Sequence, residues 1–352
     1  MPGTLQPPQP NGFPPGRRGV YLLTHPRSAS NLFQTMMSKQ PGYQNSGYKL
    51  FDGGFATLMN LEKGPLSEWP EEERTALYET FKKAFGSLED ELDDCAKNNK
   101  QAFVKEHTIF LSGPDRLFST VYPHDNPPAL TIHQRNESPS SSSSSLQHTN
   151  PTSVPDSLLL TLQPIFQIRH PILMFPSMLR AQKDSFPDMF TKPRSLYTCT
   201  TYTLKYTRAL YEWYAEREAT SGIVPRIIDA DDIMNNPLAV RQLCLQCGLD
   251  PEAVQYEWEE KKIEDNPLMA RFLSTINASK VSLWLLRNAC EMYVDFLQGI
   301  KKGYEAKGLT MEVERKKWVE EWNEEFAADL EDFVSKAMDD YVFLWERRVK
   351  GE

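Results

Sequence analysis

One short stretch of the chain constrains its fold more than any other. Residues Tyr21–Phe33 read as an apolar strand that runs through a tight loop into the first turn of a helix. The first N–H groups of a helix lack intrahelical partners and carry the positive end of its dipole, so such a junction suits a phosphate group. Arg27 adds a permanent positive charge, and Ser28, Ser30 and Asn31 add short polar side chains. The stretch predicts a ribose-phosphate or phosphosulfate site, with a serine-capped strand–helix turn as the alternative.

Strand-like apolar segments alternate with helical patterns along the chain. Strands are expected at 19–24, 101–111, 158–168 and 225–230, and helices at 31–38, 66–98, 194–219 and 237–247. This alternation indicates a mostly parallel sheet with helices on both faces. We therefore expect a single three-layer α/β domain over 19–352, preceded by a disordered segment at 1–18.

Two regions depart from the alternation. Between about 123 and 156 the composition shifts to Ser, Pro, Asn and His, with an unbroken run of serines at 140–145, which predicts a disordered insertion within the domain. From about 279 to 350 helical patterns dominate and predict a helical C-terminal cap. Apolar residues recur there at three- and four-residue steps, which indicates core packing first and a homodimer seam second. They are Trp318, Trp322, Phe326, Leu330 and Phe333.

Composition narrows the class of protein. The net charge is −9 and the basic residues are scattered, which argues against nucleic acid as a partner because phosphate neutralisation needs a concentrated cationic surface. No apolar run approaches the roughly 20 residues that cross a bilayer, and residues 1–18 lack the apolar core of a secretory signal. Five cysteines do not suggest a disulfide framework, and Cys244 and Cys247 lie in a helical pattern with no second pair. The sequence predicts a cytoplasmic protein that binds small molecules and uses no membrane or metal.

A second candidate site follows the third expected strand. Arg169 stands where that strand ends, and Ser177 lies eight positions further on, inside a short helix begun by Pro171. Ligands of open α/β sheets gather at the carboxyl ends of the strands, so these two side chains can converge on one phosphate. The alternative is an arginine paired with an acidic neighbour and a serine that caps a helix or faces solvent.

These segments resemble motifs of the sulfotransferase family. Thr24–Ser30 is similar to the family's phosphosulfate loop, a strand followed by Pro-(Lys/Arg)-Ser-Gly-(Ser/Thr). Arg169-His170-Pro171 with Ser177 looks like its 3′-phosphate motif, and 227–249 resembles its acidic-hydrophobic strand, Asn-Pro and a helix ending in Gly-Leu. The motifs stand in the family's order and span about 19–251. The loop variant and the Ser-rich insertion are similar to divergent fungal members, often enzymes of secondary metabolism.

The resemblance implies 3′-phosphoadenosine 5′-phosphosulfate as the donor and a hydroxyl of a small molecule as the acceptor. Arg27 would pair with the 5′-phosphosulfate, and Arg169 with Ser177 would hold the 3′-phosphate. The loop backbone and its serine hydroxyls would cradle the phosphosulfate, through Ser28, Ala29, Ser30, Asn31 and Leu32.

The resemblance also implies the residues of the chemical step. Lys105-Glu106-His107 ends the second expected strand and is similar to the Lys-x-His that many family members place opposite the loop. An imidazole suits proton removal from an acceptor hydroxyl. The expected catalytic residues are therefore His107, Arg27 and Lys105. His25 and His170 compete for the role of base, and Glu106 or an acidic residue at 66–98 is the fallback.

Two positions and one C-terminal segment depart from the family pattern. Ala29 stands where the family has Gly, so a methyl group points into a region where the backbone approaches the phosphate closely. We expect Ala29 to adopt right-handed helical dihedrals, which would keep the loop but with looser or altered binding. Asn31 replaces a Thr. Lys301-Lys302-Gly303 is the nearest match to a C-terminal Arg-Lys-Gly segment that completes the 3′-phosphate site.

Other functions remain open at this point. A diverged enzyme could have lost the donor and catalyse elimination, cyclisation or acid–base chemistry in the same pocket, and a non-catalytic scaffold is the third possibility. A P-loop kinase is disfavoured because GxxxxGK[ST] is absent and only Asp229, Asp231 and Asp232 follow a strand as carboxylates. Aromatic residues at 197–214 could form a wall against a planar acceptor, or pack in the core.

Overall fold

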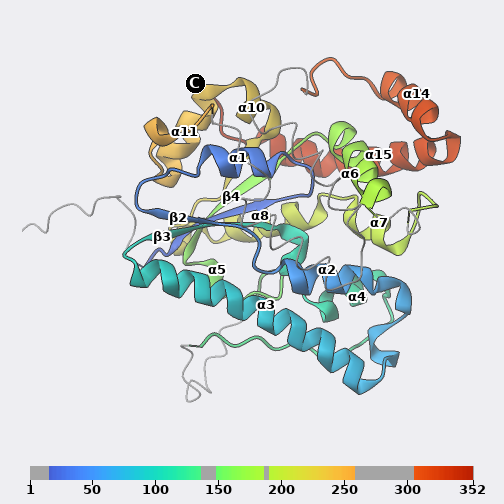
Figure 1. The fold of residues 1–352 in the computed structure, drawn as a ribbon, viewed down its shortest axis with the longest axis horizontal. Helices are drawn as coiled ribbons and strands as arrows, with labels where there is room; N and C mark the ends of the chain where they lie inside the picture. The colour runs from blue at the N-terminus through green and yellow to red at the C-terminus, as the bar shows by residue number, and fades with distance from the viewer. Residues whose placement is uncertain (1–15, 136–147, 186–189, 258–304, 352) are drawn as a thin grey trace, which may run out of the picture.

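The centre of the molecule is a parallel sheet (Figure 1). The structure is a computed structural model that describes residues 16–135, 148–185, 190–257 and 305–351. Within these residues the sheet has five strands in the order β2-β3-β1-β4-β5. Every neighbouring pair is parallel, which confirms the predicted α/β class. The strands are β1 (Gly19–Thr24), β2 (Tyr43–Ser46), β3 (Gln101–His107), β4 (Leu162–Ile168) and β5 (Arg226–Asp229).

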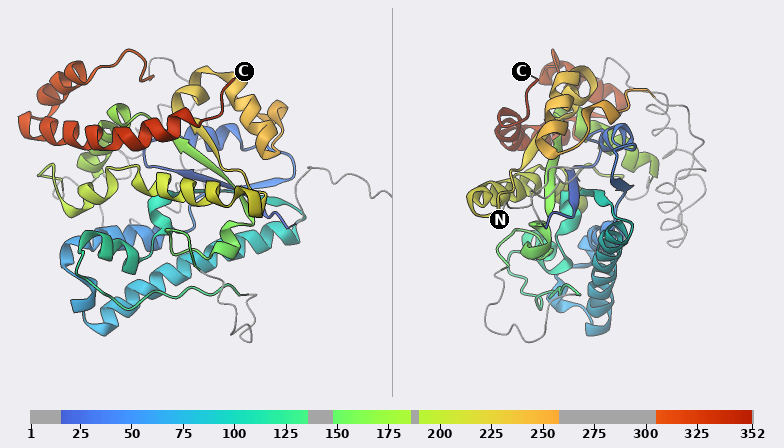
Figure 2. Two further views of the ribbon diagram at one scale, coloured as in Figure 1. Left: turned by 180° about the vertical axis from the view of Figure 1, so that it is seen from behind. Right: turned by 90° about the vertical axis from the view of Figure 1, so that its left-hand side faces the viewer.

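Helices surround this sheet, as Figure 2 shows from two further sides. In the first half of the chain they are α1 (Ser30–Met36), α2 (Phe51–Met59), α3 (Glu71–Lys97), α4 (Pro114–Val121), α5 (Asp156–Leu159) and α6 (Pro171–Ser185). In the second half they are α7 (Leu196–Thr201), α8 (Lys205–Glu216), α9 (Glu218–Ser221), α10 (Ala230–Asn235), α11 (Pro237–Cys247), α14 (Met311–Glu321) and α15 (Glu324–Glu346). Short 3₁₀ turns are η1 (Leu61–Lys63), η2 (Leu66–Glu68), η3 (Thr108–Leu111) and η4 (Pro251–Ala253).

The alternation of side chains along β1 separates two hydrophobic cores. Val20 and Leu22 pack with residues of α1, α10 and α11 on one face. Tyr21 and Leu23 pack with residues of α3, α6, α8 and α15 on the other. All four β1 side chains are fully buried, because successive residues of a strand point to opposite faces and both faces are covered. The three-layer arrangement follows from this pattern.

The register of the strands brings the candidate sites to one edge. Thr24 of β1 pairs with His107 of β3 and with Gln167 of β4. The loop after β1, the end of β3 and Arg169 therefore meet at the carboxyl ends of the strands. The chain leaves β1 toward β2 on one side, while β4 lies on the other side of β1. Such a switch point is where open α/β sheets bind their ligands.

The prediction of a single helix over 194–219 is wrong. The segment forms α7, α8 and α9, with a break at 202–204. Within the break, the Thr203 hydroxyl accepts a hydrogen bond from the Lys205 N–H at 3.2 Å, the kind of local side-chain bond that competes with helical pairing. The break turns Tyr202 into the core, where its ring stacks on Phe175 with centroids 5.2 Å apart.

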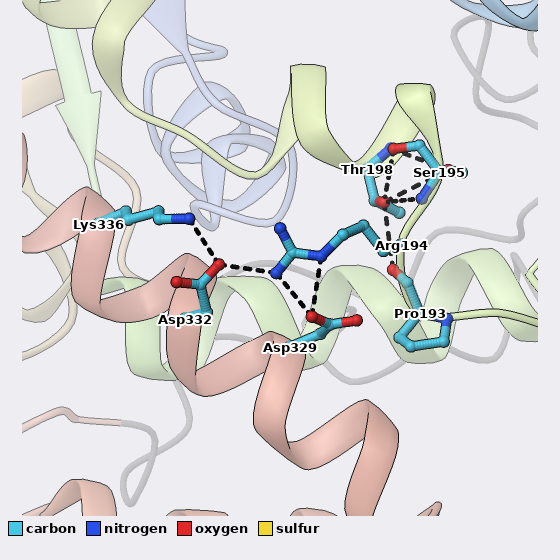
Figure 3. Close-up of polar contacts among 7 residues, drawn as sticks. All are labelled: Pro193, Arg194, Ser195, Thr198, Asp329, Asp332 and Lys336. Carbon is cyan, nitrogen blue, oxygen red and sulfur yellow. Dashed lines mark hydrogen bonds and ion pairs between the residues drawn. The ribbon is translucent and has the colours of Figure 1, made fainter.

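The C-terminal helix α15 is anchored to the rest of the domain by polar contacts (Figure 3). Arg194, just before α7, bonds Asp329 at 2.6 Å and Asp332 at 2.7 Å. At the other end, the Tyr341 hydroxyl donates to the Asp229 carboxylate at 3.0 Å, within the core. The apolar stripe of this region is core packing, as predicted, because Trp318, Phe326, Leu330 and Phe333 are buried inside the chain.

Several expectations fall partly or wholly outside the described residues. They are the segment 1–15, the serine run, the start of the helical region at 279–304 and Lys301-Lys302-Gly303. The flanks of the Ser-rich stretch are described, and its second flank packs on the fold with Asn150, Thr152 and Ser153 buried. Cys244 and Cys247 are buried in α11 as free thiols. Among the residues described, no helix is long and apolar enough to cross a membrane.

Candidate active site

The loop between β1 and α1 has an unusual backbone. Arg27 and Ala29 have φ values of 66° and 63°, in the left-handed region, and Ser28 between them does not. The Ser28 hydroxyl donates to the His25 carbonyl at 2.7 Å, and the Gln167 amide of β4 donates to the Ser28 carbonyl. Alternating signs of φ turn successive N–H groups toward one side, as in the anion-binding nests of other proteins. The loop is therefore tied to β4 in a shape suited to an anion.

Ala29 does not take the right-handed dihedrals expected from the sequence. It caps α1 with φ 63° and ψ 26°, without a side-chain hydrogen bond. A Cβ atom is disfavoured in this conformation, which glycine adopts without strain. The position therefore retains the backbone geometry of a glycine although it carries a methyl group.

Replacing Ala29 by Gly is expected to raise the free energy of unfolding by up to about 1 kcal/mol. Relief of the left-handed strain outweighs the extra freedom that glycine gains in the unfolded chain. Ala76→Gly on the exposed face of α3 is the matched control and should lose about 1 kcal/mol. Urea denaturation measures both. Equal destabilisation by the two substitutions would contradict the left-handed backbone at Ala29.

The two predicted phosphate motifs meet in the structure. The Arg27 Nε donates to the Ser177 hydroxyl of α6 at 3.0 Å. Arg169, buried at the end of β4, donates from Nη1 to the Arg27 carbonyl at 3.1 Å. Both contacts go to neutral oxygens, of the Ser177 hydroxyl and the Arg27 carbonyl. The two guanidinium groups thereby form a cationic cluster beside the loop, which suits an anionic group.

A carboxylate borders this cluster. Asp231 of α10 accepts a hydrogen bond from the Ala306 N–H at 2.8 Å. Burial raises the pKa of Asp231, and the nearby positive charge of Arg169 opposes that rise. Asp231 therefore offsets part of the charge of Arg169, a feature that sequence reasoning noted only as an acidic residue after a strand.

The end of β3 carries a fully buried lysine. The Lys105 Nζ donates to the Asn31 side chain of α1 and lies 4.4 Å from the centroid of the Tyr48 ring. Burial lowers the pKa of Lys105 to about 7. The structure thus brings Lys105 to Asn31, which replaces the Thr of the family pattern, and places an ionisable amine next to the loop.

His107 lies between two hydroxyl groups. Its Nδ1 is 2.7 Å from the Thr24 hydroxyl, and its Nε2 is 3.0 Å from the Tyr48 hydroxyl. Burial first, and then the charge of Lys105, hold the pKa of His107 well below its usual 6.5. The imidazole is therefore neutral at neutral pH, the form that can accept a proton.

The competing candidates have other surroundings. Both ring nitrogens of His25 face backbone carbonyls, of Pro26 and of Thr201, each at 2.8 Å. Glu106 points to the opposite face of β3, where it accepts backbone N–H bonds from Lys49, Leu50 and His107. Burial raises its pKa to about 7. These contacts suit structural roles, since they hold backbone segments in place.

Tyr48, which contacts both Lys105 and His107, was not predicted from the sequence. It lies between β2 and α2, and β2 itself was not predicted. Its only sequence signal is a lone aromatic residue after Gly47, which many loops share. An open pocket of about 600 Å³ lies at the start of β5, away from the carboxyl ends of the strands. Arg226 and Lys350 are among its lining residues, and none of the predicted site residues is.

Comparisons with known proteins agree with the resemblance. The chain is 28% identical to Sulfotransferase ppzF of Metarhizium majus (strain ARSEF 297), over 94% of this chain and 97% of that protein. It is also 28% identical to Sulfotransferase ppzF of Metarhizium rileyi (strain RCEF 4871), over 96% of this chain and 98% of that protein. No family model matches the chain, and no solved structure matches it significantly. The full-length similarity to these two proteins supports the resemblance to a divergent, sulfotransferase-like branch found in fungi.

Proposed function

We propose that the chain transfers a sulfuryl group from 3′-phosphoadenosine 5′-phosphosulfate to a hydroxyl of a small molecule. One observation carries the proposal, the contact of Arg27 with Ser177 beside buried Arg169. Two motifs 150 positions apart in sequence thereby form one cationic cluster. The printed names of the two relatives support the same class of reaction.

The residues fit the two anionic ends of such a donor. Arg169 and Ser177 would hold the 3′-phosphate, and Arg27 with the backbone of Ser28–Leu32 would hold the 5′-phosphosulfate. The donor, when bound, would supply the sulfuryl group together with a phosphate leaving group. Arg27 and Lys105 would stabilise the negative charge that grows on the bridging oxygen.

The base of the reaction would be His107. Its low pKa keeps the imidazole neutral. His107 pairs with Thr24 at the end of β1, and β4, which leads to Arg169, lies on the other side of β1. We propose that it takes the proton of the acceptor hydroxyl as the sulfuryl group is transferred. A secondary metabolite as the acceptor fits the fungal relatives and is part of this proposal.

Calorimetry with adenosine 3′,5′-bisphosphate tests the donor site. We expect micromolar binding to the full chain, and a loss of at least tenfold in affinity in both Arg27→Ala and Arg169→Ala, because each variant removes a charged partner of a phosphate. Adenosine 5′-monophosphate should bind more weakly than the bisphosphate, and Arg169→Ala should abolish this difference.

Arg241→Ala is the matched control, since Arg241 pairs with Glu252 on the exposed surface. Its affinity for the bisphosphate should equal that of the wild type. Absence of measurable binding to a folded wild-type chain would contradict the donor site. It would favour an enzyme that keeps Lys105 and His107 for acid–base chemistry without this donor, an alternative that Asp231 beside Arg169 also favours.

A further inference from the structure

We propose that Tyr48 is a second proton-transfer residue, whose phenol passes the acceptor's proton to His107. The inference rests on the proposed function, because it concerns the path of the proton in that reaction. Its basis is the hydrogen-bond chain Glu106–Thr24–His107–Tyr48.

The direction of that chain follows from its first member. The Glu106 backbone carbonyl can only accept, so the Thr24 hydroxyl donates its single hydrogen to it, at 3.1 Å. The 2.7 Å contact between Thr24 and His107 Nδ1 is then donated by the imidazole N–H. A neutral imidazole has one N–H, which leaves a lone pair on Nε2. The Tyr48 hydroxyl, 3.0 Å away, therefore donates to Nε2.

This arrangement places a phenol on the nitrogen that would act as the base. An acceptor hydroxyl that bonds the Tyr48 oxygen can lose its proton to His107 without displacing the tyrosine. Tyr48 is half-buried, and its ring lies under the Lys105 Nζ, which reaches Asn31 of the loop. The same phenol thus contacts the base and the lysine that faces the donor loop.

The surrounding backbone fixes Tyr48 in this position. The Glu106 carboxylate accepts the N–H groups of the next two residues, Lys49 at 2.9 Å and Leu50 at 2.7 Å. The Tyr48 ring packs on the His107 ring, with centroids 4.8 Å apart, and on Phe51, at 5.9 Å. A relay needs such fixed geometry, since both proton transfers occur over hydrogen-bond distances.

The step balances in atoms and electrons. The acceptor oxygen forms a bond to sulfur, and the bond from sulfur to the bridging oxygen breaks, with its electron pair going to the departing phosphate. The Tyr48 oxygen receives the acceptor's proton while its own proton moves to His107 Nε2. The phenol is restored, and His107 becomes an imidazolium that later releases its proton to solvent.

Tyr48→Phe tests the relay, because it keeps the ring against Lys105 and His107 and removes only the hydroxyl. With 3′-phosphoadenosine 5′-phosphosulfate and 2-naphthol as probes, we expect kcat to fall at least tenfold, within the range of lost proton-transfer catalysis. The affinity for adenosine 3′,5′-bisphosphate should not change. Tyr78→Phe is the matched control. Tyr78 lies on α3, and its hydroxyl donates to the Pro128 carbonyl, so kcat should be that of the wild type.

Nuclear magnetic resonance of ¹⁵N-histidine-labelled full chain gives a second readout that does not depend on turnover. The wild-type His107 should show N–H at Nδ1. Tyr48→Phe should raise the pKa of His107, because a donor to the neutral form is lost. The reversed tautomer, with Nε2 donating to Tyr48, would instead give a fall in that pKa and would overturn the proposal.

The two proposals fail in different ways. A wild-type chain that transfers no sulfuryl group to any phenol probe would overturn the proposed function. A wild-type chain that transfers it while Tyr48→Phe keeps full kcat would leave the proposed function standing and overturn the relay alone.

Discussion

His107→Gln is expected to lower kcat for transfer from 3′-phosphoadenosine 5′-phosphosulfate to 2-naphthol by about 10²- to 10⁴-fold, the usual contribution of a general base. A glutamine amide can still bond Thr24 and Tyr48 but cannot take a proton. The fold and the nucleotide site should therefore be unaffected, so the affinity for adenosine 3′,5′-bisphosphate should stay at the wild-type value. Initial rates and calorimetry separate the two effects.

The pH dependence of the wild-type rate should identify the same groups. His107 has a pKa well below 6.5, so it stays neutral and the rate should not fall between about pH 8 and pH 6.5 through its protonation. Lys105 has a pKa of about 7, so its positive charge and the rate should decline as the pH rises through 7.

For the His107→Gln prediction, His124→Gln at an exposed position is the control for loss of a histidine. Wild-type kcat in His107→Gln would remove the imidazole from the chemistry.

The interior strands of this fold could be predicted because their side chains are buried on both faces. β1 was predicted at its observed bounds, 19–24, as a continuous apolar run. β2 was missed because Tyr43–Ser46 (YQNS) is short and polar and lies at the edge of the sheet. Its strand conformation comes from pairing with β3, a tertiary contact that a local pattern does not contain.

The candidate site could also be predicted only in part from the sequence. Arg27, Arg169 and Ser177 could be selected because they stand in recognisable motifs. The bond between Arg27 and Ser177 joins distant segments and depends on how the loop closes over β4. The left-handed Ala29 also depends on that closure, since nothing in its residue type favours a positive φ. Tyr48 gave no distinctive signal, because its role comes from its contacts with Lys105 and His107 of β3.

Lys105→Met is expected to stabilise the fold by about 2–3 kcal/mol at pH 7. Burial lowers the pKa of Lys105 from 10.5 to about 7. Since one pKa unit corresponds to about 1.4 kcal/mol, this lowering corresponds to roughly 5 kcal/mol of lost stability. Methionine fills similar space without charge, but it loses the bond to Asn31 and the contact with the Tyr48 ring, which offset part of the gain. Loss of transfer activity should accompany the gain in stability.

The sign of the pH dependence distinguishes this cause from better packing. Between about pH 7 and 10.5 the unfolded chain holds a proton on Lys105 that the folded chain does not, so wild-type stability rises with pH through that window. Lys105→Met lacks this rise, so its advantage should shrink toward pH 10.5. Glu106, whose pKa is raised from 4.5 to about 7, makes stability fall from about pH 4.5 to 7 in both proteins. Urea denaturation from pH 6 to 10, with Lys83→Met at an exposed position of α3 as control, measures the difference. An advantage that stays constant across this range would show that burial of the lysine charge is not its source.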